Sequence, residues 1–193
     1  MNQAILEPLE KILDPEDTTV GGGGSSALSG AMAASMIGMV AGLSIKKPVN
    51  LTPEDYEDVI RECRELSEKL QQGSEEDMKA YGLIVDAFKL PKNTEEEKAV
   101  RSAAVQKAAQ KAAEVPLENA RMNLRVHELG AKLKGNSNPA CLSDLTCALY
   151  LSEAGLKDCI LNVNANLGMI KDEEEVRYLK DSMLELLLEA ICF

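Results

Sequence analysis

The sequence predicts an all-α protein, a bundle of long helices, from its composition and its hydrophobic periodicity. Of the 193 residues, 45% are hydrophobic but only 3% are aromatic, with no Trp, so Leu, Ala, Val, Ile and Met must fill the core, as in helical bundles. Apolar residues recur every three or four positions in each long stretch, which is the helical period. The length suffices for a substantial core, alone or with a partner subunit, and no repeat or linker divides the chain, so we treat residues 1–193 as a single domain.

The charge and the cysteines limit the partners and the compartment. A formal net charge of −11 argues against nucleic acid and anionic membranes, since both require a basic surface. Residues 1–20 lack the basic region of a signal peptide. The apolar stretch 27–45 is long enough to span a membrane, but its Ala, Gly, Ser and Met gain little from lipid, so we expect a buried helix and no membrane partner. Five cysteines without Cys-x-x-Cys spacing indicate reduced, mostly buried thiols in a cytoplasmic protein: Cys63, Cys141, Cys147, Cys159 and Cys192.

The first elements are a short helix and a glycine run. Helical spacing of apolar residues predicts a helix over residues 2–13, ended by Asp14–Pro15. Gly21–Ser26 then predicts a flexible, amide-rich loop that leads into a helix over residues 27–45. No lysine follows the glycines, as a P-loop requires, and no strand precedes them, as a dinucleotide fingerprint requires. The loop therefore either binds an anionic or carbonyl group at the helix N-terminus or is a plain linker.

The helix over residues 27–45 carries a ridge of small residues. Gly30, Ala34, Gly38 and Gly42 are spaced by four, so they share one face. Such a face lets another helix or a ligand approach to backbone distance.

The next helix is predicted to bury a carboxylate. Thr52 as N-cap and Pro53 at the first helical position start this helix. The apolar stripe that follows is Val59, Cys63, Leu66, Leu70, Gly73 or Ser74, Asp77, Tyr81, Ile84 and Phe88. This spacing places Asp77 on the buried face, where an unpaired carboxylate is costly or holds its proton more tightly. Two alternatives remain open: the helix breaks at Gly73 and exposes Asp77, or a buried Lys or Arg pairs with it.

The second half of the chain predicts three more helices. Thr94 and Glu97 form a capping box for a helix that continues through Pro116, because the apolar period persists beyond that proline. His127 is the only histidine, so we expect no metal site and read it as a residue of the helix face. Ser143 and Asp144 are interpreted as the cap of a helix over Leu142–Leu167, and residues 172–193 are predicted to form a closing amphipathic helix.

Two asparagines lie one turn apart on the helix that ends near Leu167. Asn162 and Asn166 are costly on a mostly apolar helix unless their amides are paired. Their partners are either each other with a backbone carbonyl, or a polar heterocycle.

Several motifs occur in the same order as in one protein family. They are Gly22–Gly23–Gly24–Ser25, Asp77–Met78–Lys79–Ala80–Tyr81, Ala87–Phe88–Lys89–Leu90–Pro91–Lys92, Glu96–Glu97–Lys98 through Arg101, Val115–Pro116–Leu117, Gly135–Asn136 followed by Ser143–Asp144, and Asn162–Val163 through Asn166–Leu167. Over nearly its whole length the chain resembles the formimidoyltetrahydrofolate cyclodeaminase / methenyltetrahydrofolate cyclohydrolase family, which occurs free-standing and as the C-terminal half of formiminotransferase-cyclodeaminase. It departs from the family at Val20–Gly21, where a proline usually precedes the glycines.

The resemblance implies an up-and-down bundle that forms a homodimer and binds a folate near the glycine loop, at or close to the subunit interface. It also implies that Asp77 is the catalytic acid/base. The expected contacts to the folate ring system are Gly22, Gly23, Gly24, Ser25, Asn136, Asp144, Asn162 and Asn166. Lys46, Lys47, Lys92 and Arg101 are candidates for the glutamate tail, because an acidic protein must supply positive charge locally.

We expect a cyclodeaminase that converts 5-formimidoyltetrahydrofolate to 5,10-methenyltetrahydrofolate and ammonia, with no cofactor beyond the folate substrate and with a formiminotransferase as a candidate partner. One alternative is a methenyltetrahydrofolate cyclohydrolase, which gives 10-formyltetrahydrofolate. The alternative from another class is a non-catalytic helical folate-binding or dimerisation protein.

Overall fold

The computed structural model describes residues 3–191, and within that range it contains six α-helices and one 3-10 turn but no strand. The helices are α1 (Gln3–Leu13), α2 (Gly22–Ile45), α3 (Pro53–Lys89), α4 (Glu95–Lys132), α5 (Leu142–Leu167) and α6 (Glu173–Ala190), and the turn is η1 (Pro139–Cys141). The predicted all-helical fold is therefore confirmed. Of the predicted buried thiols, Cys192 lies outside the described residues.

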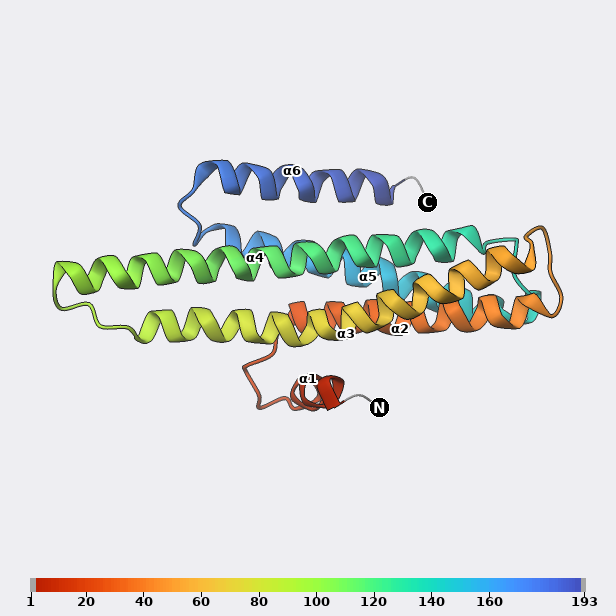
Figure 1. Ribbon diagram of the computed structural model, residues 1–193, viewed down its shortest axis with the longest axis horizontal. Helices are drawn as coiled ribbons and strands as arrows, with labels where there is room; N and C mark the ends of the chain where they lie inside the picture. The colour runs from red at the N-terminus through yellow and green to blue at the C-terminus, as the bar shows by residue number, and fades with distance from the viewer. Residues whose placement is uncertain (1–2, 192–193) are drawn as a thin grey trace.

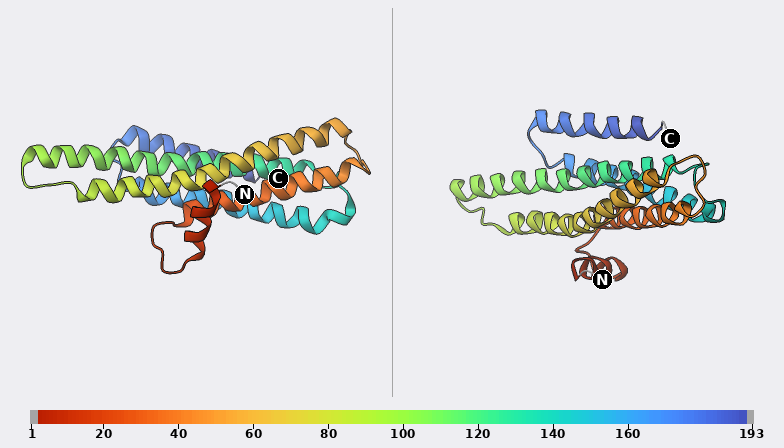
Figure 2. Two further views of the ribbon diagram at one scale, coloured as in Figure 1. Left: turned by 60° about the horizontal axis from the view of Figure 1, so that its bottom comes forward. Right: turned by 45° about the vertical axis from the view of Figure 1, so that its right-hand side comes forward.

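Four helices form the bundle that carries the core. The neighbouring pairs are α2–α3, α3–α4, α4–α5 and α5–α2, and consecutive helices run in opposite directions (Figure 1). The helix α6 packs on α4 and α5, whereas α1 lies on the opposite side of the bundle and packs mainly on α3. The hairpin of α3 and α4 extends past the other helices (Figure 2). As a result α2 begins near the middle of the bundle, beside the second half of α3 (Figure 1).

Capping residues fix where the long helices begin. The hydroxyl of Thr52 accepts the N–H of Asp55, whose carboxylate accepts the N–H of Thr52, and Thr94 forms the same capping box with Glu97. Both predicted starts are confirmed, and α4 continues through Pro116 as predicted. The predicted cap of the next helix is wrong. Asn138 caps η1, and α5 begins at Leu142 without a side-chain cap, so Ser143 and Asp144 lie in its first turn.

The small-residue helix α2 packs against α3, α4 and α5. A Cβ atom on Gly30 would lie 2.3 Å from Oδ1 of Asn123 in α4, and one on Gly38 would lie 3.4 Å from Cβ of Cys63 in α3. The predicted ridge therefore does bring helices to backbone distance. By length and composition α2 could span a membrane, and half of its apolar window is buried between these helices.

Two buried asparagines on α4 fit against glycines of three other helices. Asn119 donates its amide to the carbonyl oxygen of Gly73 at 3.3 Å, and a Cβ on Gly73 would lie 2.0 Å from its Oδ1. Asn123 lies between Gly30 and Gly155, where added Cβ atoms would come within 2.3 and 2.2 Å of its Oδ1. These amides are almost completely buried. Each helix contact is therefore possible only because glycine has no side chain.

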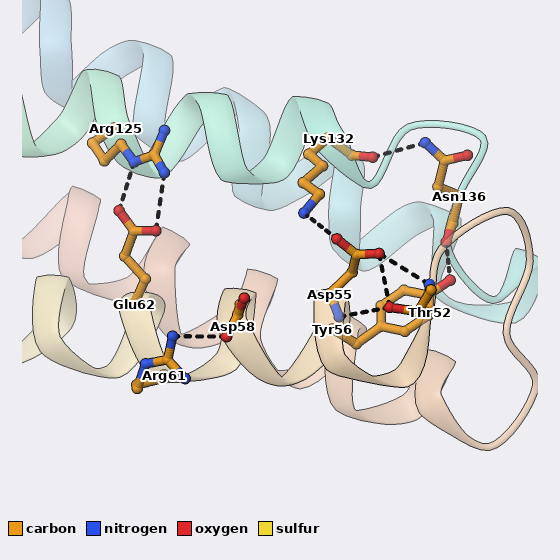
Figure 3. A network of polar contacts seen from close by, with 9 residues as sticks. All are labelled: Thr52, Asp55, Tyr56, Asp58, Arg61, Glu62, Arg125, Lys132 and Asn136. Carbon is orange, nitrogen blue, oxygen red and sulfur yellow. Dashed lines mark hydrogen bonds and ion pairs between the residues drawn. The ribbon is translucent and has the colours of Figure 1, made fainter.

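Polar contacts join α3 to α4 and to the loop that follows α4, at the end of the bundle away from the α3–α4 loop (Figure 3). Arg125 donates from Nε and Nη2 to the two carboxylate oxygens of Glu62, at 2.6 and 3.0 Å. Lys132 pairs with Asp55 at 3.0 Å, and the hydroxyl of Tyr56 donates to the backbone carbonyl of Asn136. The two exposed ion pairs each contribute about 0–1 kcal/mol, so they support the bundle less than its core does.

Candidate functional site

A cavity of about 230 Å³ opens beside the N-terminus of α2. Its walls come from four helices and the segment before α2: Thr18, Thr19, Gly21, Gly23, Asp77, Tyr81, Ile84, Ala112, Asn162, Ala165 and Asn166. Four of the predicted site residues line it together, namely Asp77, Gly23, Asn162 and Asn166.

Asp77 is the one acidic side chain in the cavity wall, and burial raises its pKa to about 6. The backbone N–H of Gly24 acts in the opposite direction, because it stabilises the charged form. Helix α3 continues through Gly73, and no Lys or Arg of the described residues forms an ion pair with Asp77. Both alternatives to a desolvated carboxyl are therefore excluded within the described chain. A carboxyl group with this pKa can take up and release a proton near neutral pH.

The glycine run is not the predicted loop but the first turn of α2. Gly21 is the N-cap and offers no side-chain cap, so the carboxylate of Asp77 takes that role for the N–H of Gly24. A Cβ on Gly23 would lie 2.3–2.5 Å from the carboxyl atoms of Asp77, and one on Gly22 would lie 3.1 Å from Nδ2 of Asn162. The side chains of Asp77 and Asn162 therefore occupy the space that side chains at these two positions would need.

The two asparagines on α5 direct their amide N–H groups to backbone carbonyls. Asn162 donates to Asp158 at 2.7 Å, and Asn166 donates to Ala112 and to the carbonyl oxygen of Asn162, each at 2.9 Å. Their side-chain oxygens have no hydrogen-bond partner among the described residues, so they can accept hydrogen bonds from a ligand.

Three predicted contacts lie at the far end of the bundle within one chain. Lys46 is the C-cap of α2, about 33 Å along the helix from Gly24. Asp144 lies about 27 Å along α5 from Asn162. The Asn136 side chain closes the adjoining loop, accepting from Asn50 at 3.0 Å and donating to the carbonyl oxygen of Lys132 at 2.9 Å. The structure does not bring these residues to Asp77 within one chain.

The other predicted contacts also lie outside the cavity wall. Lys92 is in the α3–α4 loop, and Arg101 lies about 16 Å along α4 from Ala112. The Arg101 guanidinium stacks on Phe88 at 5.5 Å and donates to its carbonyl oxygen at 3.1 Å. The Ser25 hydroxyl donates to the carbonyl oxygen of Gly21 at 3.2 Å, and Ser25 does not line the cavity.

Sequence reasoning did not assign the hydroxyl-bearing residues of the cavity wall to the site, namely Tyr81, Thr18 and Thr19, and it placed Tyr81 in the core. Tyr81 and Phe88 were expected on the buried stripe, but they are 47% and 48% exposed, because Ala80, Ile84 and Ala87 form the packed face there. Tyr81 lines the cavity instead, as do Thr18 and Thr19. The spacing of Tyr81 one turn after Asp77 is a signal that could have found it, whereas nothing in the sequence marks the threonines.

The described residues contain no group of three or more His, Cys, Asp or Glu side chains arranged to hold a metal ion. His127 lies about 23 Å along α4 from Ala112, and its Nδ1 forms a hydrogen bond of 2.9 Å with the hydroxyl of Ser152. Burial lowers the pKa of this histidine. It therefore lies outside the site, on a helix face as predicted.

Comparison with known proteins gives consistent matches over most of the chain. The family described as formiminotransferase-cyclodeaminase matches residues 6–185. The chain is 34% identical to a methenyltetrahydrofolate cyclohydrolase of Methylorubrum extorquens, over 93% of this chain and 90% of that protein. It is 31% identical to the formimidoyltransferase-cyclodeaminase of Gallus gallus, over 88% of this chain but only 32% of that protein, so it spans about a third of the length of such relatives.

A solved structure has the same fold. The crystal structure of a formiminotetrahydrofolate cyclodeaminase from Thermotoga maritima superposes with a TM-score of 0.82 at 26% identity, over 96% of this chain and 89% of that one. The resemblance drawn from the motifs is confirmed: the chain belongs to the formiminotransferase-cyclodeaminase family.

Proposed function

We propose that the chain is a 5-formimidoyltetrahydrofolate cyclodeaminase in which Asp77 moves the proton. The observation that carries the proposal is a single desolvated carboxyl group, with a pKa of about 6, in a cavity bounded by helix N-terminal amides and two asparagines. Family membership supports a folate as the substrate.

One carboxyl group suffices for this reaction. N10 attacks the carbon of the protonated formimidoyl group on N5, and the resulting tetrahedral centre carries N5, N10 and the amino group that must leave. Asp77, largely ionised at neutral pH, takes the proton from N10 and delivers it to the leaving nitrogen. The C–N bond to that nitrogen then breaks, giving ammonia and 5,10-methenyltetrahydrofolate. A positioned acid/base of matched pKa contributes about 10²–10⁴-fold to such a step.

The asparagines and the α2 terminus position the ring. The 2-amino-4-oxo edge of a tetrahydropterin presents N–H donors, which suit the unpaired oxygens of Asn162 and Asn166. By their position, the N–H groups of Gly22 and Gly23 have no partner within α2, so they suit the oxygen at the ring's C4. Holding N5 and N10 side by side next to Asp77 would supply the orientation that the ring closure needs.

We also propose a homodimer that completes the site. A cavity of about 230 Å³ is smaller than the roughly 300–1,000 Å³ typical of ligand sites, and no Lys or Arg of the described chain lines it. From Gly22 to Ile45 α2 carries no charge, yet Met32, Met39 and Leu43 are exposed. A second copy covering this face is the kind of partner that an exposed apolar stripe requires. Lys46, Lys47, Lys92, Arg101, Asn136 and Asp144 stay predicted folate contacts, to be supplied by either subunit.

A second candidate is methenyltetrahydrofolate cyclohydrolase. The match to the Methylorubrum extorquens protein over nearly the whole of both chains favours it. In that reaction Asp77 would instead take a proton from the water that attacks the carbon between N5 and N10. A formiminotransferase partner and a cytoplasmic location stay predictions.

Two assays on the same preparation decide the reaction. Release of ammonia from 5-formimidoyltetrahydrofolate supports the cyclodeaminase. Loss of methenyltetrahydrofolate absorbance, with no ammonia released from 5-formimidoyltetrahydrofolate, supports the cyclohydrolase. Asp77→Asn is expected to lower the rate about 100-fold or more, whereas Asp86→Asn, at an exposed site on the same helix, is expected to keep it. Turnover of neither substrate by the unaltered protein would favour a non-catalytic folate-binding or dimerisation protein.

A further inference from the structure

Tyr81 stands at the mouth of the cavity rather than in its interior. Gly23, Ile84 and Ala112 are buried and form the inner end, whereas Tyr81 is 47% exposed. Tyr81 is the one aromatic residue in the cavity wall, and its hydroxyl has no hydrogen-bond partner among the described residues. A large flat side chain thus lies at the rim with about half of its surface open to a ligand.

The position of Tyr81 is fixed relative to the reacting atoms. It follows Asp77 by four residues on α3, so the two Cβ atoms are about 5–6 Å apart on the same face of the helix. In the proposed reaction N10 lies beside Asp77, and N10 is bonded directly to the aminobenzoyl ring. That ring therefore lies about one helical turn from Asp77. This is the spacing at which an aromatic partner on α3 reaches it, since ring pairs are stable at centroid separations of about 4.5–7 Å.

The pterin is expected to lie against the cavity wall formed by α5. Its polar edge matches the asparagines of α5, and the cavity is too small to enclose the rest of a folate. The aminobenzoyl group must then leave past the rim. We propose that Tyr81 stacks on the aminobenzoyl ring of the folate as it leaves the cavity. The inference rests on the proposed function and adds to it a residue that makes the protein bind a complete folate more tightly than a free pterin.

The test compares two ligands and three variants. 5-Formyltetrahydrofolate carries the aminobenzoyl ring, and 5-formyl-6-methyltetrahydropterin keeps the bicyclic ring system without it. Tyr81→Leu is expected to weaken binding of the first ligand about tenfold and of the second less than about twofold, from the usual strength of aromatic pairs. Tyr81→Phe should keep both affinities. Tyr150→Leu, which removes another exposed tyrosine away from the cavity, serves as the matched control.

Kinetics give a second, independent readout. Stacking contributes the same binding free energy to the substrate and to the transition state. Tyr81→Leu should therefore raise KM about tenfold and leave kcat within about threefold. Unaltered affinity of Tyr81→Leu for 5-formyltetrahydrofolate, or equal weakening of both ligands, would overturn the stacking while the proposed function stands. Failure of the unaltered protein to bind either ligand would overturn both.

Discussion

Replacement of Asp77 by Asn is expected to stabilise the folded protein in a pH-dependent way while it removes catalysis. Burial raises the pKa of this carboxyl from 3.8 to about 6. Because the pKa is higher in the folded than in the unfolded state, this carboxyl stabilises the folded protein most below pH 3.8. That stabilisation is lost as the pH rises through about 6. Relative to a carboxyl with the ordinary pKa, the raised pKa therefore lowers the stability of the native state by roughly 3 kcal/mol at pH 8 and about 1.5 kcal/mol at pH 5. A neutral amide of the same size does not incur this cost.

Urea unfolding of both proteins at pH 5 and pH 8, at one fixed protein concentration, measures the effect. Asp77→Asn should gain about 1.5 kcal/mol more at pH 8 than at pH 5. The control Asp86→Asn, on the exposed face of the same helix, should stay within about 0.5 kcal/mol of the unaltered protein at both pH values. A gain that is absent, or equal at the two pH values, would refute the claim that Asp77 is held away from water beside α2.

Three further predictions concern the site, the helix packing and the dimer. Because the acid/base must be ionised, kcat/KM should fall about tenfold per pH unit below about pH 6, and a flat profile down to pH 5 would contradict the role of Asp77. Gly73→Ala should lower the free energy of unfolding by about 1–3 kcal/mol, since its Cβ would lie 2.0 Å from Oδ1 of the buried Asn119. Gly82→Ala, on the same helix with open space around it, should raise that free energy by about 0.5–1 kcal/mol, and urea titration of the pair checks the contrast. Met39→Lys should turn a dimer into single chains in sedimentation velocity; an unchanged boundary would place the interface elsewhere.

The helices were predictable because their signals are local. A capping box or an N-cap followed by proline acts over four residues, so Thr52 and Thr94 mark the starts of α3 and α4 without knowledge of the rest of the fold. The cap of α5 was misjudged because the 3-10 turn η1 comes before the helix and Asn138 caps that turn instead. The inward position of Asp77 was predictable because its place in the stripe depends only on the helical period.

The remainder of the site depends on contacts that no local pattern contains. Four glycines favour a loop by intrinsic propensity, and the carboxylate of Asp77 supplies the missing cap from another helix. Motifs near helix ends, such as those with Asn136 and Asp144, lie at the far end of an antiparallel bundle, and order along the chain does not indicate that separation. Tyr81 shares a face with Asp77, but the sequence could not show that the packed face turns to Ala80 and Ile84 at that point.

The fit of Asn119 and Asn123 against glycines has a consequence for exchanging segments between members of the family. These amides reach Gly73, Gly30 and Gly155, each on a different helix, so α4 has a single permitted alignment along the bundle axis. A shift of one residue would move an amide by about 1.5 Å and rotate it into a neighbouring side chain. In a chimaera that receives only α4 from a relative, the amides of that α4 would not meet glycines at the matching positions of the other helices. Only transfer of the five positions as one set should preserve the contact between α2 and α3 on which the proposed chemistry depends.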